Sequence, residues 1–483
     1  MRAIVPLTLL LAACPKPAEV DPLADVQVHD PAVKRDFPEP LPETPFEAPK
    51  VETRKLSNGM QVVIASNNEV PLVRVEMAFK VAGFADEVPG TARVTFDMLN
   101  EGAGDLSAEQ ISGKLKAMAS TLSTRAGVTS GSVQISTLKR NLAATLDLME
   151  TVVEEPTFPA EEWELRKVQY IAGVKQAKAD PNSIASRVRS HVIYGDAYGG
   201  EVEQEAHFEA MSPDTMKTWW KTYAGPENAI LLVGGDVTAD EIVPMLEERF
   251  GSWKPEGIQS PEAAPEPKWP DASTLYLVDK PGAAQSVVSV VNEVGTRTDP
   301  DWFQWDMGMD VLGGLFVSRM NMNLREDKAY TYGARCRTSA LDGPGIAVCS
   351  ASVKTAVTGP SLVEIRKELT EIRGERPITD DEIAYMKSTT VNGYPRRFET
   401  PSTMLGEQEA IWRYGLPADW LATYLDNVTA VTRDQAQAAF EKHWDPNAEV
   451  WIVVGDKSVI GDDLEAFGLP VVELDVDGNP IGE

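Results

Sequence analysis

The chain has 483 residues and a formal net charge of −29; 43% of its residues are hydrophobic and 25% are charged. This is the composition of a globular protein long enough for about three domains. The excess of negative charge argues against binding to nucleic acid phosphates. Beyond the N-terminal leader, no segment is apolar for the about 20 residues that a transmembrane helix needs.

The first residues are predicted to be a lipoprotein signal peptide. Arg2 precedes an apolar run over residues 3–13, which is too short to span a bilayer and is typical of a signal-peptide core. The run ends in Leu-Ala-Ala-Cys at residues 11–14, which resembles the lipobox of bacterial lipoproteins. The resemblance implies removal of residues 1–13 and lipidation of Cys14. An ordinary signal peptide followed by a chance cysteine is the alternative.

Residues 14–50 are expected to be a tether, because residues 15–50 contain nine prolines and many charges. We therefore expect the protein in the bacterial cell envelope, lipid-anchored on the periplasmic side. Pro15 and Lys16 follow the cysteine in place of an aspartate. By analogy with lipoprotein sorting, this favours the outer membrane over the inner one.

Residues 51–253 are predicted to form the first half of the folded part. The half begins with apolar segments typical of strands, such as MQVVIAS at 60–66 and LVRVEMAFKVAG at 72–83. A helix is expected between Gly90 and Gly102. Arg93, Phe96 and Asp97 share one face of it at i, i+3 and i+4, where three side chains could hold a metal or a substrate.

A linker and a second half follow. Residues 254–272 contain five prolines and no apolar periodicity, which indicates a linker. The second half, residues 273–459, again begins with strand-like segments, and residues 460–483 are expected to be a short acidic tail. Runs of strands and helices in each half indicate an α+β fold in which an antiparallel sheet packs against helices.

Two cysteines of the second half lie symmetrically about a turn. Cys336 and Cys349 belong to two strand-like segments around the turn residues 342–345. In an exported protein a disulfide between them is expected, because they would face each other across a hairpin in an oxidising compartment. Two buried free thiols are the alternative.

Each half ends in a copy of one 25-residue segment, which indicates an internal duplication. Residues 212–236 and 432–456 align without a gap, and a Pro and a Gly-Asp pair coincide in both. Ser212 and Thr432 are predicted helix N-caps, and Thr432 forms a capping box with Gln435. A buried strand is expected at the end of each copy.

The order of these elements resembles the pitrilysin-like (insulinase, M16) zinc peptidases, in particular the bacterial group related to the mitochondrial processing peptidase. The segments that carry the resemblance include AGFADEVPGTARVTFDMLNEG at 82–102 and LREDKAYTYG at 324–333. It covers nearly everything from about residue 51 to residue 459. It implies two homologous halves of the fold described above.

The resemblance also implies that the zinc site is lost. Family members carry His-x-x-Glu-His on the first helix, with two zinc ligands and a general base, and a further glutamate downstream. Those positions are Arg93, Phe96 and Asp97 here, and the glutamate falls near Ala172 and Gly173. The only histidines are His29, His191, His207 and His443, and no two have ligand spacing. We expect no metal, no cofactor and no peptidase activity in this chain alone, and an i,i+4 ion pair between Arg93 and Asp97.

A second feature of the family is retained. Active members carry an arginine and a tyrosine, which match Arg325 and Tyr332 here, to contact the substrate backbone and the oxyanion. Without the resemblance, a surface ion pair and a packed aromatic would be the simpler reading. Arg319 and Asn323 nearby are assigned to structure.

This combination matches the non-catalytic chain of family members that divide the work between two homologous subunits. The expected partner is a subunit with His-x-x-Glu-His and bound zinc, and the expected substrates are peptides or unfolded segments added as a strand to a sheet edge. The alternative is an inactive envelope scaffold or binding protein with the same fold. A zinc-independent enzyme is a third reading, which no group of residues supports.

Overall fold

The computed structural model describes residues 46, 48–195, 200–260, 268–339 and 345–482, and residues 47–483 belong to one compact unit. Cys14 and the tether up to residue 45 lie outside the described residues. Within the described ranges, no helix is both long and apolar enough to cross a membrane.

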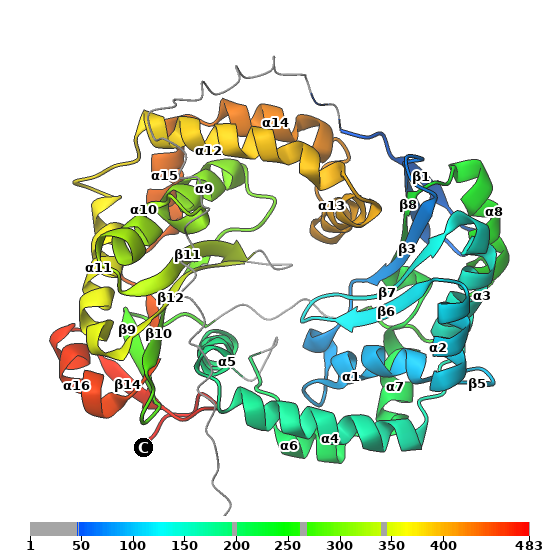
Figure 1. Ribbon diagram of the computed structural model, residues 1–483, viewed down its shortest axis with the longest axis horizontal. Coiled ribbons are helices and arrows are strands. Elements are labelled where there is room, and N and C mark those ends of the chain that lie inside the picture. Colours follow the sequence, from blue (N-terminus) through cyan, green and yellow to red (C-terminus); the bar gives the residue numbers. More distant parts are fainter. Residues whose placement is uncertain (1–45, 47, 196–199, 261–267, 340–344, 483) are drawn as a thin grey trace, which may run out of the picture. The chain divides into compact units, whose positions relative to one another are not determined.

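The first half forms a six-stranded sheet with helices on one face (Figure 1). The strands follow the order β1-β2-β8-β3-β7-β6, so β6 lies at an edge. The elements in chain order are β1 Glu52–Lys55, β2 Gln61–Ser66, β3 Leu72–Phe79, α1 Thr91–Met98, β4 Gly102–Ala103, β5 Leu106–Ser107, α2 Ala108–Ala117, β6 Thr121–Ala126, β7 Gly131–Leu138, α3 Leu142–Glu154, α4 Ala160–Ala177, α5 Pro181–Tyr194, α6 Glu205–Ala210, α7 Pro213–Tyr223, β8 Ala229–Gly235 and α8 Ala239–Phe250.

The second half repeats this plan with the strand order β11-β12-β10-β13-β9-β14, which places β11 at an edge. Its elements are β9 Thr274–Asp279, β10 Gln285–Val294, α9 Trp302–Met309, α10 Arg319–Asn321, β11 Thr331–Ser339, β12 Gly345–Lys354, α11 Thr358–Glu371, α12 Asp380–Gly393, α13 Pro401–Tyr414, α14 Trp420–Ala430, α15 Arg433–His443, β13 Val450–Gly455, α16 Lys457–Ala466 and β14 Val471–Leu474. A wide helical turn, Met322–Asp327, leads into β11.

The expected α+β fold with two homologous halves is confirmed, and the duplicated segment lies at the centre of each sheet. Ser212 and Thr432 cap α7 and α15 as predicted, each in a capping box. The strands that follow, β8 and β13, are buried throughout. The sheets are mixed rather than wholly antiparallel, because β8 runs parallel to β2, and β13 and β14 run parallel to β9.

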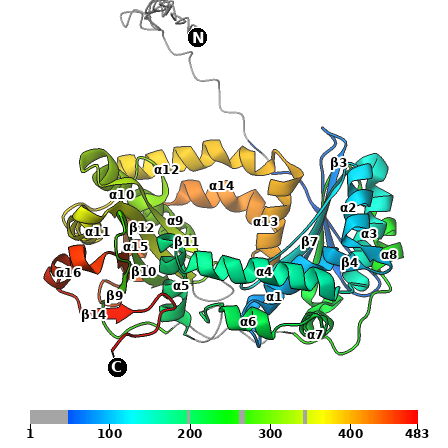
Figure 2. The ribbon, with the colours of Figure 1, turned by 60° about the horizontal axis from the view of Figure 1, so that its bottom comes forward.

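One helix from each half packs on the sheet of the other half. Helices α4 and α12 run between the two sheets and lead into α5 and α13 (Figure 1, Figure 2). Helix α5 packs on β10 and β13, where Ile184 and Val188 join Val287, Val291 and Ile452 in one core. Helix α13 packs on β8, β3 and β2 in the first half. The two halves therefore share their cores.

The two exchanged helices have the same start and stop signals. Asp180 and Thr400 cap them, Pro181 and Pro401 take the first helical position, and a glycine with positive φ follows the last residue of each. The interval of 220 residues between the two prolines equals that between Ser212 and Thr432, so the duplication extends upstream of the segment that the sequence comparison detected.

The expectation of an acidic tail at residues 460–483 is wrong. Residues up to Ala466 belong to α16, and β14 adds to the second sheet beside β9. Beyond β14, Asp477 accepts ion pairs from Lys178 (3.0 Å) and Arg187 (2.9 Å) of the first half. The strand has only 4 residues, which is too short for a periodic pattern to reveal it in the sequence.

The hairpin of β11 and β12 brings the two cysteines opposite each other. Cys336 pairs with Cys349 in the strand register, and their sulfurs form a disulfide of 2.03 Å. The predicted turn falls largely on residues 340–344, which lie outside the described part of the chain.

The exchange of α13 makes a prediction about stability. Leu405 of α13 is 0% exposed and packs among Val63, Ala78, Ile230 and Leu232 of the first sheet. We expect Leu405→Ala to lower the free energy of unfolding by about 2–4 kcal/mol, because it leaves a cavity between the halves. Denaturant titration measures this. Val363→Ala, at an exposed position of α11, is the control and should change the free energy by less than about 0.5 kcal/mol. Equal stability of the two variants would show that α13 does not pack on this sheet.

Candidate functional site

Helix α1 holds the three positions at which zinc peptidases of the resembled family place their ligands and base. Gly90 precedes the helix with φ +90°, and a Cβ at this residue would lie 2.9 Å from Oε1 of Glu203. The Asp86 carboxylate accepts a hydrogen bond from the backbone N–H of Ala92 at 2.9 Å. Glycine at position 90 thus lets a carboxylate from a distant segment approach the start of α1.

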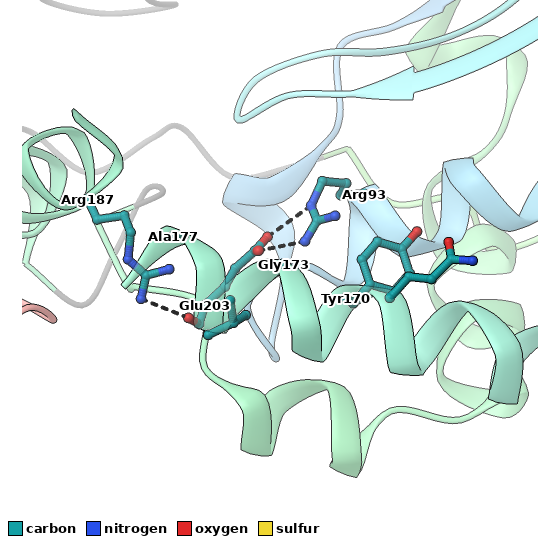
Figure 3. Close-up of a pocket in the computed structure, with 8 residues that line it drawn as sticks. Arg93, Tyr170, Gly173, Ala177, Arg187 and Glu203 are labelled. Atoms are coloured by element: carbon teal, nitrogen blue, oxygen red, sulfur yellow. Dashed lines mark hydrogen bonds and ion pairs between the residues drawn. The ribbon is translucent and has the colours of Figure 1, made fainter. Parts of the chain in front are cut away.

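That carboxylate neutralises Arg93. The guanidinium donates from Nε to Oε1 of Glu203 at 3.1 Å and from Nη2 to Oε2 at 2.6 Å, as a two-pronged ion pair (Figure 3). It also stacks 4.7 Å from the ring centre of Tyr170 and 5.5 Å from that of Phe208. Burial would lower the pKa of Arg93, but the hydrogen bond and the charge of Glu203 outweigh it and raise the pKa.

The expected ion pair between Arg93 and Asp97 is therefore not the one that forms. The Tyr170 hydroxyl donates to Oδ2 of Asp97 at 2.7 Å, while Arg93 turns to Glu203. Burial raises the pKa of Tyr170, and the neighbouring Asp97 charge raises it further, so the phenol stays protonated as a donor. The reason for the difference is tertiary: α4 and the segment before α6 supply better-placed partners than the helix itself.

Phe96 occupies the position of the family's general base and is part of the core. Its side chain is 0% exposed and makes edge-to-face contacts with Phe79, Trp219 and Trp220 at centroid distances of 5.4–5.9 Å. A Cβ at Gly131 would lie 2.4 Å from the Phe96 ring, so this glycine leaves room for it. The side chain points away from any solvent that a base would have to activate.

The predicted place of the missing downstream glutamate is next to this network. Gly173 of α4 lines a pocket of about 400 Å³ together with Arg93, Tyr170, Arg187 and Glu203, whereas Ala172 is exposed and does not line it (Figure 3). These residues do not fit zinc. Asp97 is the single donor among the four family positions, its carboxylate is hydrogen-bonded to Tyr170, and a cationic guanidinium takes the place of one imidazole.

The described histidines have structural partners. His191 Nδ1 lies 3.0 Å from the carbonyl oxygen of Gly200, and the His207 ring accepts from the backbone N–H of Gln204 at 3.2 Å. His443 lies 3.1 Å from the Asp301 carboxylate, close to Asp299. Asp301 also pairs with Lys442 at 2.8 Å, and Asp299 accepts from Thr296, so each carboxylate already has a protein donor.

Arg325 and Tyr332 come together at a second pocket, of about 280 Å³, beside β11. The Arg325 guanidinium donates to the backbone carbonyl of Tyr332 at 2.9 Å and lies 4.7 Å from the ring centre of Phe316. The Tyr332 side chain is 89% exposed, so its hydroxyl is available to a ligand. Helix α5 contributes to both pockets, with Arg187 in the first and Asn182 in the second.

Arg319 and Asn323 have the structural roles that were expected. Arg319 forms a two-pronged ion pair with Glu382 of α12, at 2.6 and 2.7 Å. The buried Asn323 amide donates to Glu364 and Glu368 of α11 at 2.9 and 2.7 Å. Both side chains hold the segment before β11 against the helices.

Sequence reasoning missed Glu203, Tyr170 and Arg187. Arg93 on a partly buried helix face requires a counterion, and that requirement was visible in the sequence. Glu203 is 110 residues away, and nothing local distinguishes it from the other acidic residues of a chain with a net charge of −29.

The site makes a prediction about zinc. We expect Zn²⁺ added to metal-stripped protein to leave the thermal unfolding midpoint unchanged, because the α1 positions lack ligands. The double variant Arg93→His/Asp97→His restores two imidazoles one turn apart and should acquire a Zn²⁺-dependent rise in the midpoint. A rise in the wild type that this variant does not exceed would contradict the assignment.

Comparisons with known proteins point to the M16 peptidases. Residues 210–390 match the family model described as the Peptidase M16 inactive domain. The Non-peptidase homolog YmxG of Helicobacter pylori is 20% identical over 402 residues, which cover 82% of this chain and 92% of that protein.

Two solved structures extend the comparison. The peptidase M16 inactive domain from Pseudomonas fluorescens superimposes with a TM-score of 0.78 and 21% identity, over 84% of this chain and 98% of that one. The periplasmic protease PqqL from Escherichia coli superimposes with a TM-score of 0.71 and 15% identity, over 88% of this chain but 49% of that one. Together, these comparisons show that residues 210–390 match the M16 domain described as inactive and that the chain shares the fold of M16-like proteins.

Proposed function

We propose that this chain is the non-catalytic, substrate-binding subunit of a heterodimeric zinc peptidase that cleaves peptides or unfolded segments. Its partner would be a homologous M16 subunit with His-x-x-Glu-His and the zinc ion. One observation carries the proposal: the metal position is filled by the chain's own Arg93–Glu203 ion pair, while Arg325 and the exposed Tyr332 remain at an open pocket.

The chemistry of these two side chains suits a site that another subunit completes. A guanidinium and a phenol are both donors for the oxyanion that forms when water attacks a peptide bond. Neither can activate the water itself. Arg325 and Tyr332 would therefore bind the substrate and stabilise its transition state, and the partner would supply the metal and the base.

The edges of the two sheets support binding of extended peptides. Strand β6 is the edge strand next to β7 in the first sheet, and β11 is the edge strand next to β12 in the second. Tyr332 belongs to β11. An edge strand offers unpaired backbone N–H and C=O groups to an added strand. A folded substrate could not present its backbone in this way, which favours unfolded segments.

The length relation to PqqL supports pairing. This chain covers 49% of a protein named as a protease, so that protease is about twice as long as the fold described here and has room for two such units. Two separate chains could supply the same two units. In that arrangement one chain can lose its metal without loss of the activity of the pair.

An inactive envelope scaffold or binding protein is the second candidate. The name of the Helicobacter pylori relative, a non-peptidase homologue, favours it. In a scaffold no reaction depends on Arg325 or Tyr332, so their substitution would leave function intact.

Affinity capture and activity assays separate the two candidates. We expect the tagged chain, purified from its own cells, to retain a stoichiometric homologue with His-x-x-Glu-His. The purified pair should hydrolyse an unfolded protein, and this chain alone should not. Arg325→Ala should lower kcat/KM of the pair by about a hundredfold, because it removes a transition-state donor, and Tyr332→Phe tests the hydroxyl alone. Arg433→Ala, at an exposed position of α15, is the control. Recovery without such a homologue, or full activity of Arg325→Ala, would sink the proposal.

We further propose that the protein is lipid-anchored through Cys14 on the periplasmic side of the envelope, at the outer membrane. The lipobox resemblance at residues 11–14 supports this. Cys14→Ala should move the protein from the membrane fraction to the soluble periplasmic fraction after cell fractionation, because one lipidated residue supplies the anchor. A variant that stays in the membrane fraction would contradict the anchor.

A further inference from the structure

The pocket beside β11 belongs to the part of the second sheet that α5 leaves uncovered. Helix α5 packs on β10 and β13, and the pocket begins at its N-terminal residue Asn182. We call this surface the β11 groove and define it by Asn182, Arg325, Tyr332, Arg335, Arg337 and Ser350. The edge strand β11 forms the floor of the groove, and α5 borders it at Asn182.

Two arginines of the groove are not neutralised. Arg335 and Arg337 are exposed on one face of β11, and no carboxylate of the described residues forms an ion pair with either. Arg325 pairs with Glu326 at 3.1 Å, but Glu326 does not line the groove, and none of the lining residues is acidic. This concentration of positive charge stands out in a chain with a net charge of −29.

In the first half, carboxylates neutralise an arginine at an equivalent position of the edge strand. Arg125 of its edge strand β6 lies 3.1 Å from Glu76 of β3 and 3.1 Å from Glu409 of the exchanged helix α13. Strand register relates Arg125 to Arg337, because β6 and β11 pair in the same way with β7 and β12. The strand register therefore matches equivalent residues of the two halves.

The two carboxylates have no counterparts in the second half. Val75 and Val288 are equivalent, because they pair with equivalent residues of β8 and β13. The next residue along each strand is Glu76 in the first half and Ser289 in the second, so these two correspond. The interval of 220 residues relates Glu409 to Arg189 on α5. A hydroxyl and a further guanidinium thus replace two carboxylates, and Ser289 Oγ and Arg189 Nε are buried without a hydrogen-bond partner. Glu293 lies on the same face of β10, near the end of the strand.

The spacing of the arginines selects one kind of ligand. Side chains at i and i+2 of a strand point the same way and lie about 6.6–6.8 Å apart. An extended chain added to β11 presents its own alternate side chains at the same interval. Two acidic residues separated by one residue would therefore meet Arg335 and Arg337 together.

We infer that the β11 groove binds an extended polypeptide with acidic side chains at alternate positions. This inference rests on the proposed substrate-binding role and names the substrate class. Arg325 and Tyr332 contact the backbone of the bound polypeptide at one end of the groove. Arg335 and Arg337 lie beyond them and pair with its acidic side chains.

Fluorescence anisotropy with short labelled peptides tests the inference on the full-length chain alone. The peptides carry blocked termini and a background of Thr and Val. One has two glutamates separated by one residue, one has them adjacent, and two further peptides replace the separated glutamates by glutamine or by lysine. We expect the separated-glutamate peptide to bind most tightly, because adjacent residues of a strand point to opposite faces.

The variants give the matched comparison. Arg335→Gln/Arg337→Gln should weaken binding of the separated-glutamate peptide by about tenfold, since each exposed ion pair is worth up to about fivefold in affinity. Arg54→Gln/Arg433→Gln removes two exposed arginines elsewhere and should leave binding unchanged. Equal affinity of the glutamate and glutamine peptides, preference for lysine, or equal loss in both double variants would overturn the inference.

The outcome is independent of the paired enzyme. Acidic-peptide binding by the isolated chain, with no zinc-bearing homologue in the affinity capture, would keep the groove and refute the heterodimer. Capture of that homologue without any preference among the peptides would keep the heterodimer and refute the acidic specificity.

Discussion

The structure depends on the exchange of α5 and α13 between the two sheets. Each sheet has one face covered by the helices of its own half and a second face whose apolar strands also need cover. Ile184 and Val188 of α5 meet this need in the second sheet, and Leu405 of α13 meets it in the first. One helix is narrower than a six-stranded sheet, so the strands at one edge of each sheet stay uncovered. These two edges, β6 in the first sheet and β11 in the second, are open to an added strand.

Helix α1 keeps its place in the fold although the positions that match the family's zinc ligands are altered. Protein groups hold α1 here: Tyr170 of α4 donates to Asp97, and Arg93 forms an ion pair with Glu203 of the segment before α6. Phe96 adds apolar burial worth about 1.5–3 kcal/mol at a position where a base would need water. The half-exposed ion pair contributes about 1 kcal/mol or less. These contacts hold the helix in place without a metal ion.

The two halves differ in the charge around matched positions of their edge strands. Arg125 in the first half has two carboxylates, whereas Arg337 has none, although both lie at matched positions of edge strands. A duplicated fold conserves its apolar contacts because they hold both copies together. Exposed charges are free to differ, so the halves can take separate roles, with one edge neutralised and the other left to a ligand.

Much of the architecture could be predicted from local signals. The caps at Ser212 and Thr432, the buried strands after them and the opposed cysteines follow from short-range propensities and periodicity, which act within one element. The absence of zinc ligands at Arg93, Phe96 and Asp97 could be predicted only through the family resemblance, which identifies these positions on one helix face. The partners Glu203 and Tyr170, the cross-half contacts of α5 and α13, and the pairing of β14 with β9 required the tertiary structure. Each of these joins segments far apart in sequence, and which of many chemically equal side chains meet is decided by the packing of the two shared cores.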